Sequence, residues 1–476
     1  MSIFGFCSLI QMYIFASKIH NLTQFKMSKD IRLKKGLNIT LQGEADKVYA
    51  SIPQSEFFCL KPTDFHGLTP KLTVKEGDKV QAGSCLFFDK YNDKIRFASP
   101  ISGSVEAIVR GAKRKILEIK LKADSEIVYQ KFPVVEGVNS RDEIIDTLLE
   151  SGVWPFIRQK PFDVVADPTD KPKAIFISTF NTAPLSPDND FVVHGLDDEF
   201  QKGIDILTKL TDGLVHLNVD GTTNPSKVFT SCKGVTLNKI SGVHPAGNVG
   251  VQIHHIDPIN KGEVIWYLYP QDVLTIARLF TDGKYDVSRI VALTGPQVEK
   301  PRYYRTIAGA SIKNMLDENT IVGENNRFIS GNVLTGDQIE QDGYLGFYDS
   351  QITILEEGNQ QAFLGWLSPN LDKFSMSKSY FSWLFPSRKY ALNTNYNGEE
   401  RAYVVTGQYE KVLPMDIYPM QLIKACLIED IDQMEQLGIY EISPEDVALC
   451  EFVCTSKMEV QSIIREGLDL IKKECS

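Results

Sequence analysis

The chain has 476 residues, a formal net charge of −10 at pH 7 and 43% apolar residues. This length is enough for about three or four domains, and the apolar fraction can fill their cores. The acidic balance excludes the basic surface that a nucleic-acid-binding protein needs. Eight cysteines without paired spacing favour a reducing compartment. No stretch after residue 26 reaches the roughly 18 consecutive apolar residues of a membrane span. We therefore expect a multidomain protein that meets a membrane only through partners or at the membrane interface.

Residues 1–26 differ from the rest of the chain. Ile3 to Ala16 is an apolar run as long as a signal-peptide core, but no lysine or arginine precedes it and no clean small-x-small cleavage site follows. The run is also too short to span a bilayer. We expect an extension, or a start assigned too early with Met27 as the true start. A membrane anchor is the alternative.

Residues 27–125 are predicted to form a β domain, because short alternating runs are separated by glycines. Val74–Gly83 followed by Phe97–Val105 resembles a lipoyl- or biotinyl-like barrel-sandwich module. A carrier module would have a modified lysine at the hairpin tip between these halves, where Lys90 and Lys94 fall. Neither has the flanking methionines typical of such a lysine, so we expect an architectural module.

Residues 126–285 are predicted to form a Rossmann-like α/β domain, because helical and strand patterns alternate there. We expect strands at 173–179 and 213–219, and helices at 142–149, 200–210 and 270–280. A dinucleotide fold would place G-x-G-x-x-G between a strand and a helix, so that the backbone can approach a pyrophosphate. That string is missing from the sequence. Gly242, Gly247 and Gly250 form a looser set that can still make a loop of exposed amides.

Residues 286–360 are predicted to form a β-grasp domain. The expected elements are short strands and one helix, at 290–293, 304–307 and 328–329 for the strands and 311–316 for the helix. This order, together with the turns Thr294–Pro296 and Ser330–Gly336, resembles the SLBB type of β-grasp domain. In electron-transfer subunits that resemblance implies a docking surface.

Residues 361–476 are predicted to combine an aromatic-rich segment with a helical region. Between Leu364 and Tyr396, aromatic side chains including Trp366 are dense and charges are sparse. Such segments occur where a surface meets a membrane or another protein. An extended segment that covers a core would have the same composition, so both interpretations stay open.

The C-terminal helices contain the cysteines with the spacing closest to that of a metal site. Ser443–Pro444 opens a helix with an N-cap and a proline at its first position, and an apolar stripe over Val460–Ile471 marks a second helix. Cys450 and Cys454 lie between them, and Cys426 is the next cysteine upstream. An iron-sulfur cluster needs about four thiolates. We therefore expect small hydrophobic side chains and no metal site.

Five segments resemble, in this order, the NqrA family of the Na+-translocating NADH:quinone oxidoreductase: Lys34–Leu37, Glu150–Phe162, Gly242–Gly250, Gly295–Arg302 and Gly407–Ile417. Each segment is weak alone, but their order is specific. The resemblance runs from Met27 to the C-terminus, which is why we expect the start there. It also implies a domain order like that of the flavin-bearing subunit of respiratory complex I, without its flavin site.

The resemblance implies a peripheral subunit on the cytoplasmic face of the bacterial inner membrane, in a complex of six subunits. That complex passes electrons from NADH to ubiquinone or another quinone and couples the reaction to Na+ export. Its flavins and iron-sulfur centres would lie in partner subunits. This chain is then expected to bind no cofactor, to have no catalytic residue and to support quinone reduction and assembly. A scaffold without any ligand is the alternative, as is an Rnf-type electron carrier, which the missing iron-sulfur cysteines disfavour.

Three histidines are the candidate quinone contacts. His244 lies in the loose glycine set, and His254 and His255 follow it. Imidazole can hydrogen-bond to a quinone carbonyl, and it titrates in the range needed to shuttle a proton. Adjacent side chains point in different directions on a strand or a helix, so His254 and His255 are not expected to chelate one metal. Structural histidines with satisfied hydrogen bonds are the alternative.

Overall fold

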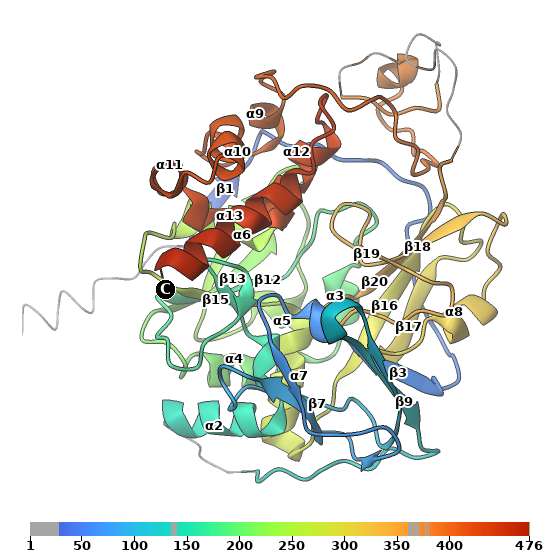
Figure 1. Cartoon of the computed structure of the whole chain (residues 1–476), viewed down its shortest axis with the longest axis vertical. Coiled ribbons are helices and arrows are strands. Elements are labelled where there is room, and N and C mark those ends of the chain that lie inside the picture. Colours follow the sequence, from blue (N-terminus) through green and yellow to red (C-terminus); the bar gives the residue numbers. More distant parts are fainter. Residues whose placement is uncertain are drawn as a thin grey trace, which may run out of the picture.

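The computed structural model describes residues 28–134, 140–359, 365, 371–376, 378 and 380–475. Their strands form four sheets, and the C-terminal helices pack beside these sheets at the upper left of Figure 1. The expected extension 1–26 and Trp366 lie outside the described residues. Within the described ranges, no helix has the length and apolar character that crossing a bilayer requires.

Two small antiparallel sheets form the barrel-sandwich module, with strand orders β3-β9-β8-β5 and β4-β6-β7. Phe65, Phe87 and Phe97 pack in its core with ring centroids 4.4 to 6.4 Å apart. Lys90 and Lys94 are exposed in the connection between β6 and β7, as expected for a hairpin tip. The elements are β3 (Phe57–Leu60), η1 (Pro62–Asp64), β4 (Pro70–Leu72), β5 (Lys79–Val80), β6 (Cys85–Asp89), β7 (Arg96–Ala98), β8 (Gly103–Arg110), η2 (Ala112–Arg114) and β9 (Ile116–Ala123).

The α/β domain has a seven-stranded sheet with the order β1-β14-β13-β12-β15-β10-β11. Its central strands are parallel, and β10 and β11 form an antiparallel edge. The strands expected at 173–179 and 213–219 are confirmed as β12 and β13. The strands are β1 (Asp30–Arg32), β10 (Arg158–Lys160), β11 (Val164–Val165), β12 (Ala174–Ser178), β13 (Leu214–Asp220), β14 (Thr236–Ser241) and β15 (Ile265–Leu268).

Helices cover both faces of this sheet. Trp266 and Leu268 pack in the core that includes α4 and α7, whereas Ile265 and Tyr267 pack on the other face with α6. Burial on both faces explains why β12 is apolar at almost every position. The expected helices at 142–149, 200–210 and 270–280 are confirmed as α2, α4 and α7. The helices are α2 (Arg141–Ser151), η3 (Trp154–Phe156), α3 (Asn189–Val192), α4 (Asp197–Leu207), α5 (Lys227–Thr230), α6 (Val249–Ile256) and α7 (Pro270–Asp282).

The β-grasp domain contains a six-stranded sheet with the order β19-β18-β20-β16-β17-β2. Its edge strand β2 comes from the N-terminal part of the chain and pairs in parallel with β17. The three expected strands and the expected helix are confirmed as β16, β17, β18 and α8. The elements are β2 (Asp46–Ala50), β16 (Ser288–Thr294), β17 (Arg302–Ile307), α8 (Lys313–Asp317), β18 (Asn326–Ser330), β19 (Asp337–Ile339) and β20 (Gln351–Glu356).

The C-terminal region is helical, and the expected helix over Val460–Ile471 is confirmed within the last helix of the chain. The segment that Ser443 caps begins as a 3-10 turn with a complete capping box before it becomes α12. The last helix begins at Val460, because Lys457 has a positive φ of 56° that no α-helix continues through. The elements are η4 (Phe381–Leu384), α9 (Tyr409–Val412), α10 (Pro419–Leu427), α11 (Ile431–Gln436), η5 (Ile439–Glu441), η6 (Pro444–Val447), α12 (Ala448–Phe452) and α13 (Val460–Cys475).

The three C-terminal cysteines are buried in the apolar core of this region. Tyr409 donates a hydrogen bond of 2.9 Å to Cys454 Sγ, and burial raises the pKa of the Cys426 thiol to about 12. Cys450 is completely buried beside them. They therefore pack as small hydrophobic side chains. The described part of the chain contains no cluster of three or more His, Cys, Asp or Glu side chains that could hold a metal ion.

The described aromatic segment divides into a covered part and an exposed part. Tyr390 is buried, and its hydroxyl donates to the Ser382 carbonyl. Trp383 and Phe385, by contrast, each expose 50% of their surface. Tyr390 therefore covers a core, as the second interpretation predicts, whereas the contact with a membrane or another protein stays a prediction for the exposed part.

Candidate functional site

The carboxyl ends of β12, β13 and β14 lie at one edge of the parallel sheet, where open α/β folds bind their ligands. A buried polar network ties this edge together. Ser178 Oγ, at the end of β12, donates to the Gly247 carbonyl at 3.1 Å and accepts from Gln252 Nε2 at 2.9 Å. The Gln252 amide oxygen accepts from Asn218 on β13. The loop between β14 and α6 is therefore fixed against the ends of β12 and β13.

His244 lies in this loop and is buried. Its Nδ1 lies 3.1 Å from Thr182 Oγ1 in the loop after β12, and its backbone N–H donates to Asn38 Oδ1. Burial lowers the pKa of the imidazole to about 4, so the ring is neutral at pH 7. Since Thr182 is already the partner of Nδ1, only the Nε2 of this neutral imidazole can serve a ligand, as a donor or as an acceptor.

His254 and His255 lie in the last turn of α6, with ring centroids 5.1 Å apart and ring planes at 88°. His254 Nε2 accepts the backbone N–H of Asp416, so its Nδ1 carries the proton and donates to Glu441 at 2.7 Å. His255 Nε2 lies 2.6 Å from the Pro414 carbonyl. The structure brings these two histidines together, whereas His244 precedes the helix. The pair joins α6 to the C-terminal region.

The three glycines of the loose set are covered by other parts of the chain. A Cβ on Gly242 would lie 2.9 Å from the Leu33 side chain, and one on Gly247 would lie 2.5 Å from the Thr182 backbone. A Cβ on Gly250, in the first turn of α6, would lie 2.2 Å from the Asp446 carboxylate. An anion at this helix end is favoured by the helix dipole. These glycines serve close packing and do not form the open cradle that a pyrophosphate group needs.

Arg158 on β10 is the most unusual residue of this region. Its guanidinium lies over three tyrosine rings, 4.6 Å from the centroid of Tyr267, 5.1 Å from Tyr269 and 4.5 Å from Tyr348. Among the described residues no hydrogen bond or ion pair holds it, and its buried Nε has no partner. The side chain is half-buried, and an unsatisfied donor at a buried atom is costly. We call Arg158 with these three tyrosines the arginine-tyrosine cluster.

The next inward-facing residue of β10, Lys160, is fully paired. Its ammonium donates to Ser443 Oγ at 2.7 Å and lies 3.5 Å from the Asp446 carboxylate, with both charged groups buried. The same carboxylate oxygen accepts from the Ser443 hydroxyl. Beside it, burial and the charge of Asp446 raise the pKa of Glu445 to about 7. The charge of Arg158 has a smaller effect in the opposite direction and lowers the pKa of Glu445.

The sequence contained a weak signal for this cluster. Arg158 and Lys160 lie in the segment Glu150–Phe162 as cations among apolar residues. Alternation on a strand places both on one face, but nothing in the sequence shows that this face is covered by η6. The partners of Arg158 come from β15 and from the β-grasp domain, so only the assembled fold reveals them.

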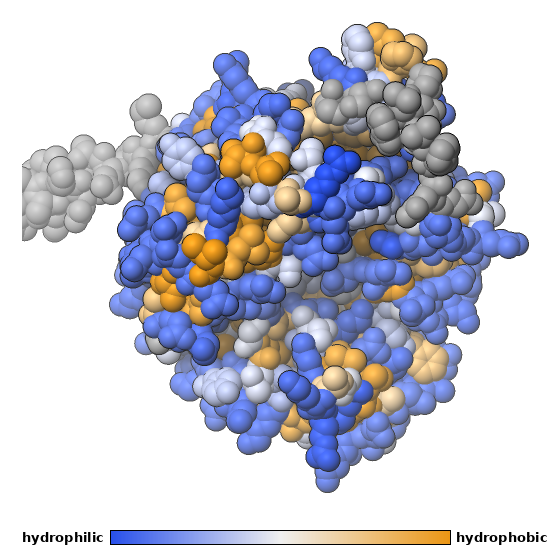
Figure 2. Space-filling view, turned by 45° about the horizontal axis from the view of Figure 1, so that its top comes forward, coloured by the Kyte–Doolittle hydropathy of each residue, from blue (hydrophilic) through white to orange (hydrophobic). Residues whose placement is uncertain are grey.

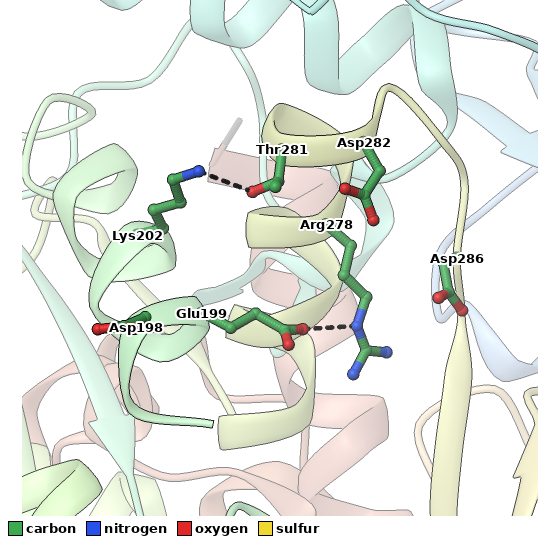
Figure 3. A pocket seen from close by; sticks show the side chains of 7 residues that line it. All are labelled: Asp198, Glu199, Lys202, Arg278, Thr281, Asp282 and Asp286. Atoms are coloured by element: carbon green, nitrogen blue, oxygen red, sulfur yellow. Dashed lines mark hydrogen bonds and ion pairs between the residues drawn. The ribbon is translucent and has the colours of Figure 1, made fainter. Parts of the chain in front are cut away.

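A surface groove of about 410 Å³ lies between α4 and α7. Figure 3 shows Glu199 and Arg278 joined across it by an ion pair of 2.6 Å, with Lys202 near Thr281. The other lining residues are all acidic: Asp198, Asp282 and Asp286. The groove is polar and its cations are occupied by neighbouring side chains. Among the described residues, no aliphatic or aromatic one lines it, and it has no convergent unpaired donors, so it does not match a quinone site.

The fold is therefore a barrel-sandwich module, an α/β domain and a β-grasp domain followed by helices, the architecture of a multidomain subunit. Three family models match it in the same order. They are the NqrA N-terminal barrel-sandwich hybrid domain over residues 31–124, the NqrA second alpha/beta domain over 139–285 and the NQRA C-terminal domain over 290–341.

Curated relatives match nearly the whole chain. The NqrA protein of the Na(+)-translocating NADH-quinone reductase of Rhodopirellula baltica is 36% identical over 93% of this chain and 98% of its own length. The corresponding protein of Pasteurella multocida is 37% identical over 93% of this chain and its full length. The chain belongs to the NqrA family of the Na+-translocating NADH-quinone reductase. Among solved structures, an air-oxidised NAD+-reducing [NiFe]-hydrogenase aligns with a TM-score of 0.39 and 10% identity, covering 70% of this chain and 61% of that one.

Proposed function

We propose that this chain is a peripheral subunit on the cytoplasmic face of the bacterial inner membrane, in a six-subunit Na+-translocating NADH:quinone reductase. The complex would pass electrons from NADH, through flavins and iron-sulfur centres of other subunits, to ubiquinone or another quinone. This transfer would drive Na+ export. The chain would support assembly and the quinone-reduction half of the reaction. The names of its relatives support the complex.

We also infer that the α/β domain is related to that of the flavin-bearing subunit of complex I and has lost the flavin site. The support is local. Leu33, Thr182 and Asp446 lie so close to Gly242, Gly247 and Gly250 that a Cβ at any of these three positions would clash. With these neighbours in place, the glycines leave no open loop of backbone amides for a phosphate group.

The arginine-tyrosine cluster is the observation that best supports a quinone contact. A quinone head group is a planar ring with two carbonyl acceptors, and it suits aromatic walls with a few convergent donors. Arg158 offers N–H donors with no acceptor among the described residues. His244 remains the second candidate contact. His254 and His255 would have to exchange Glu441 and Pro414 for the ligand.

The chain's own residues would bind and protonate the quinone. Reduction to quinol takes two electrons, which partner subunits would supply, and two protons. An N–H group of Arg158 would donate to one carbonyl oxygen and stabilise the charge that develops there. The Glu445 carboxyl, whose pKa is raised to about 7, would release one proton to the reduced oxygen and take up a proton from solvent afterwards. The second proton would come directly from solvent.

The test compares the complex reconstituted with wild-type chain, with Arg158→Met and without this chain. We expect full assembly with both chains, and a raised KM for quinone in the variant. We expect incomplete assembly without the chain. A complex that assembles fully and reduces quinone at the normal rate without this chain would remove both proposed roles.

A scaffold without any ligand is the second candidate function. It is favoured by the histidine pair, because both nitrogens of His254 and the Nε2 of His255 already have partners in the chain. In that case Arg158→Met would leave the KM for quinone unchanged, while omission of the chain would still prevent assembly.

A further inference from the structure

Residues 380–385, which we call the aromatic turn, carry large apolar side chains into solvent. Phe381 exposes 51% of its surface, Trp383 50%, Leu384 53% and Phe385 50%. Contiguous exposed apolar side chains of this size mark a surface that another phase or molecule covers. In Figure 1 the turn stands at the upper right corner, away from the sheets. Figure 2 shows hydrophobic colour at the same corner.

The turn is held on a fixed base. Tyr390 is 4% exposed and its hydroxyl donates to the Ser382 carbonyl at 3.2 Å. Thr40 Oγ1 donates to the Arg388 carbonyl at 2.9 Å, and Tyr390 forms a bridge with Leu41. The exposed side chains of the turn therefore project from backbone that the rest of the protein anchors.

The charges next to the turn have the sign opposite to that of the whole chain. Residues 371–390 contain four cations and one anion, whereas the chain has a net charge of −10. Arg388 pairs with Asp372, and Lys389 with Glu44. Lys373 and Lys378 are in no ion pair with a described residue. Instead they lie over the rings of Tyr380 and Trp383, at 5.8 and 5.7 Å.

We propose that the aromatic turn inserts into the headgroup region of an anionic lipid bilayer. Tryptophan and tyrosine favour this depth because one end of each ring is apolar and the other is polar. The stems of Lys373 and Lys378 would lie along the rings while their ammonium groups reach anionic phosphates. A protein partner would cover the apolar side chains equally well, but two cations without a carboxylate partner beside them favour a surface that is itself anionic.

This inference rests on the proposed function, which places the chain at the face of a membrane. Its test needs no partner subunit. The purified full chain is floated with vesicles of phosphatidylglycerol and phosphatidylcholine, and with vesicles of phosphatidylcholine alone. We expect binding to the anionic vesicles, a blue shift of the Trp383 fluorescence and loss of binding at high salt. The double variant Lys373→Gln/Lys378→Gln should bind roughly thirtyfold more weakly, because two cations near the anionic surface are lost.

The double variant Trp383→Ser/Phe385→Ser should abolish binding. Tyr418→Ser/Ile428→Ser is the matched control, because it removes two exposed apolar side chains from another part of the surface, 65% and 68% exposed. It should bind like the wild type. Equal binding of wild type and Trp383→Ser/Phe385→Ser overturns the proposal, as does equal binding to both kinds of vesicle. If no vesicle binds but the complex fails to assemble with Trp383→Ser/Phe385→Ser, the turn is a protein contact and the lipid proposal is wrong.

Discussion

Two groups of polar side chains on the same face of the α/β domain differ in how completely they are paired. The first group joins α6 and β10 to the C-terminal region: His254 with Glu441, His255 with Pro414, and Lys160 with Ser443 and Asp446. The second is Arg158, which lies over three tyrosines with no hydrogen bond or ion pair to a described residue. We assign the paired side chains to stability and Arg158 to ligand binding. The side chains of the first group are held by partners in the chain and stabilise a domain contact, although one buried oxygen of Asp446 has no partner among the described residues. The unpaired guanidinium of Arg158 suits a ligand.

Asp446→Ala should give the largest effect, because it leaves the buried ammonium of Lys160 without its carboxylate. Removing one partner of a buried pair costs about 3 to 5 kcal/mol in free energy of unfolding. Denaturant unfolding measures it. Asp469→Ala is the matched control, because the pair of Asp469 with His66 is largely exposed and should contribute less than about 1 kcal/mol. Equal losses in the two variants would contradict the account of the paired contact.

His254→Ala and Arg158→Met should then separate the two groups. His254→Ala leaves Glu441 and the Asp416 N–H without their partner, which costs about 1 to 3 kcal/mol. Arg158→Met removes a charge without an ion-pair partner, and we expect a change within about 1 kcal/mol, neutral or stabilising. Both values come from denaturant unfolding of the full chain. A loss for Arg158→Met as large as that for His254→Ala would mean that Arg158 is a structural residue.

Glu445 should make stability depend on pH. Burial and Asp446 raise its pKa from 4.5 to about 7, so between these values the folded state holds a proton that the unfolded state releases. This group therefore lowers stability as pH rises through the range. Glu445→Gln has no such dependence. Between pH 4.5 and pH 7.5 the free energy of unfolding of the wild type should fall relative to that of Glu445→Gln by about 3 kcal/mol. The contribution of His244 to the pH dependence is the same in the wild type and in Glu445→Gln, so it cancels in the difference between them. A difference that is constant with pH would contradict the raised pKa.

The smallest expected effect concerns the visible absorption spectrum of the purified chain. Purified chain should show neither a flavin band nor an iron-sulfur band in the visible range. The glycine positions are covered by protein, and Cys426, Cys450 and Cys454 are packed in the C-terminal core. Flavin released on heating, or stoichiometric iron, would contradict the expectation that partner subunits carry these cofactors.

Local patterns predicted much of the fold because both faces of the α/β sheet are buried. The strand over 174–178 is a continuous apolar run, and the helix over 270–282 begins with a proline. The C-terminal helices were harder, since Lys457 interrupts them with a positive φ that the sequence does not reveal. The histidines can be recognised as candidate contacts from the sequence, because imidazole is a titratable side chain. Arg158 cannot, because its three tyrosines come from two domains and meet only in the folded chain.

Titration of a short-chain, water-soluble quinone into the purified chain tests the central claim most directly. Wild type and His254→Ala should bind with equal affinity, because His254 is occupied by Glu441 and Asp416. Arg158→Met should bind several-fold more weakly, since loss of one hydrogen bond costs about 0.5 to 1.5 kcal/mol. His244→Ala should show a smaller loss. If the quinone binds Arg158→Met as tightly as the wild type, or binds neither, the arginine-tyrosine cluster is not the quinone contact.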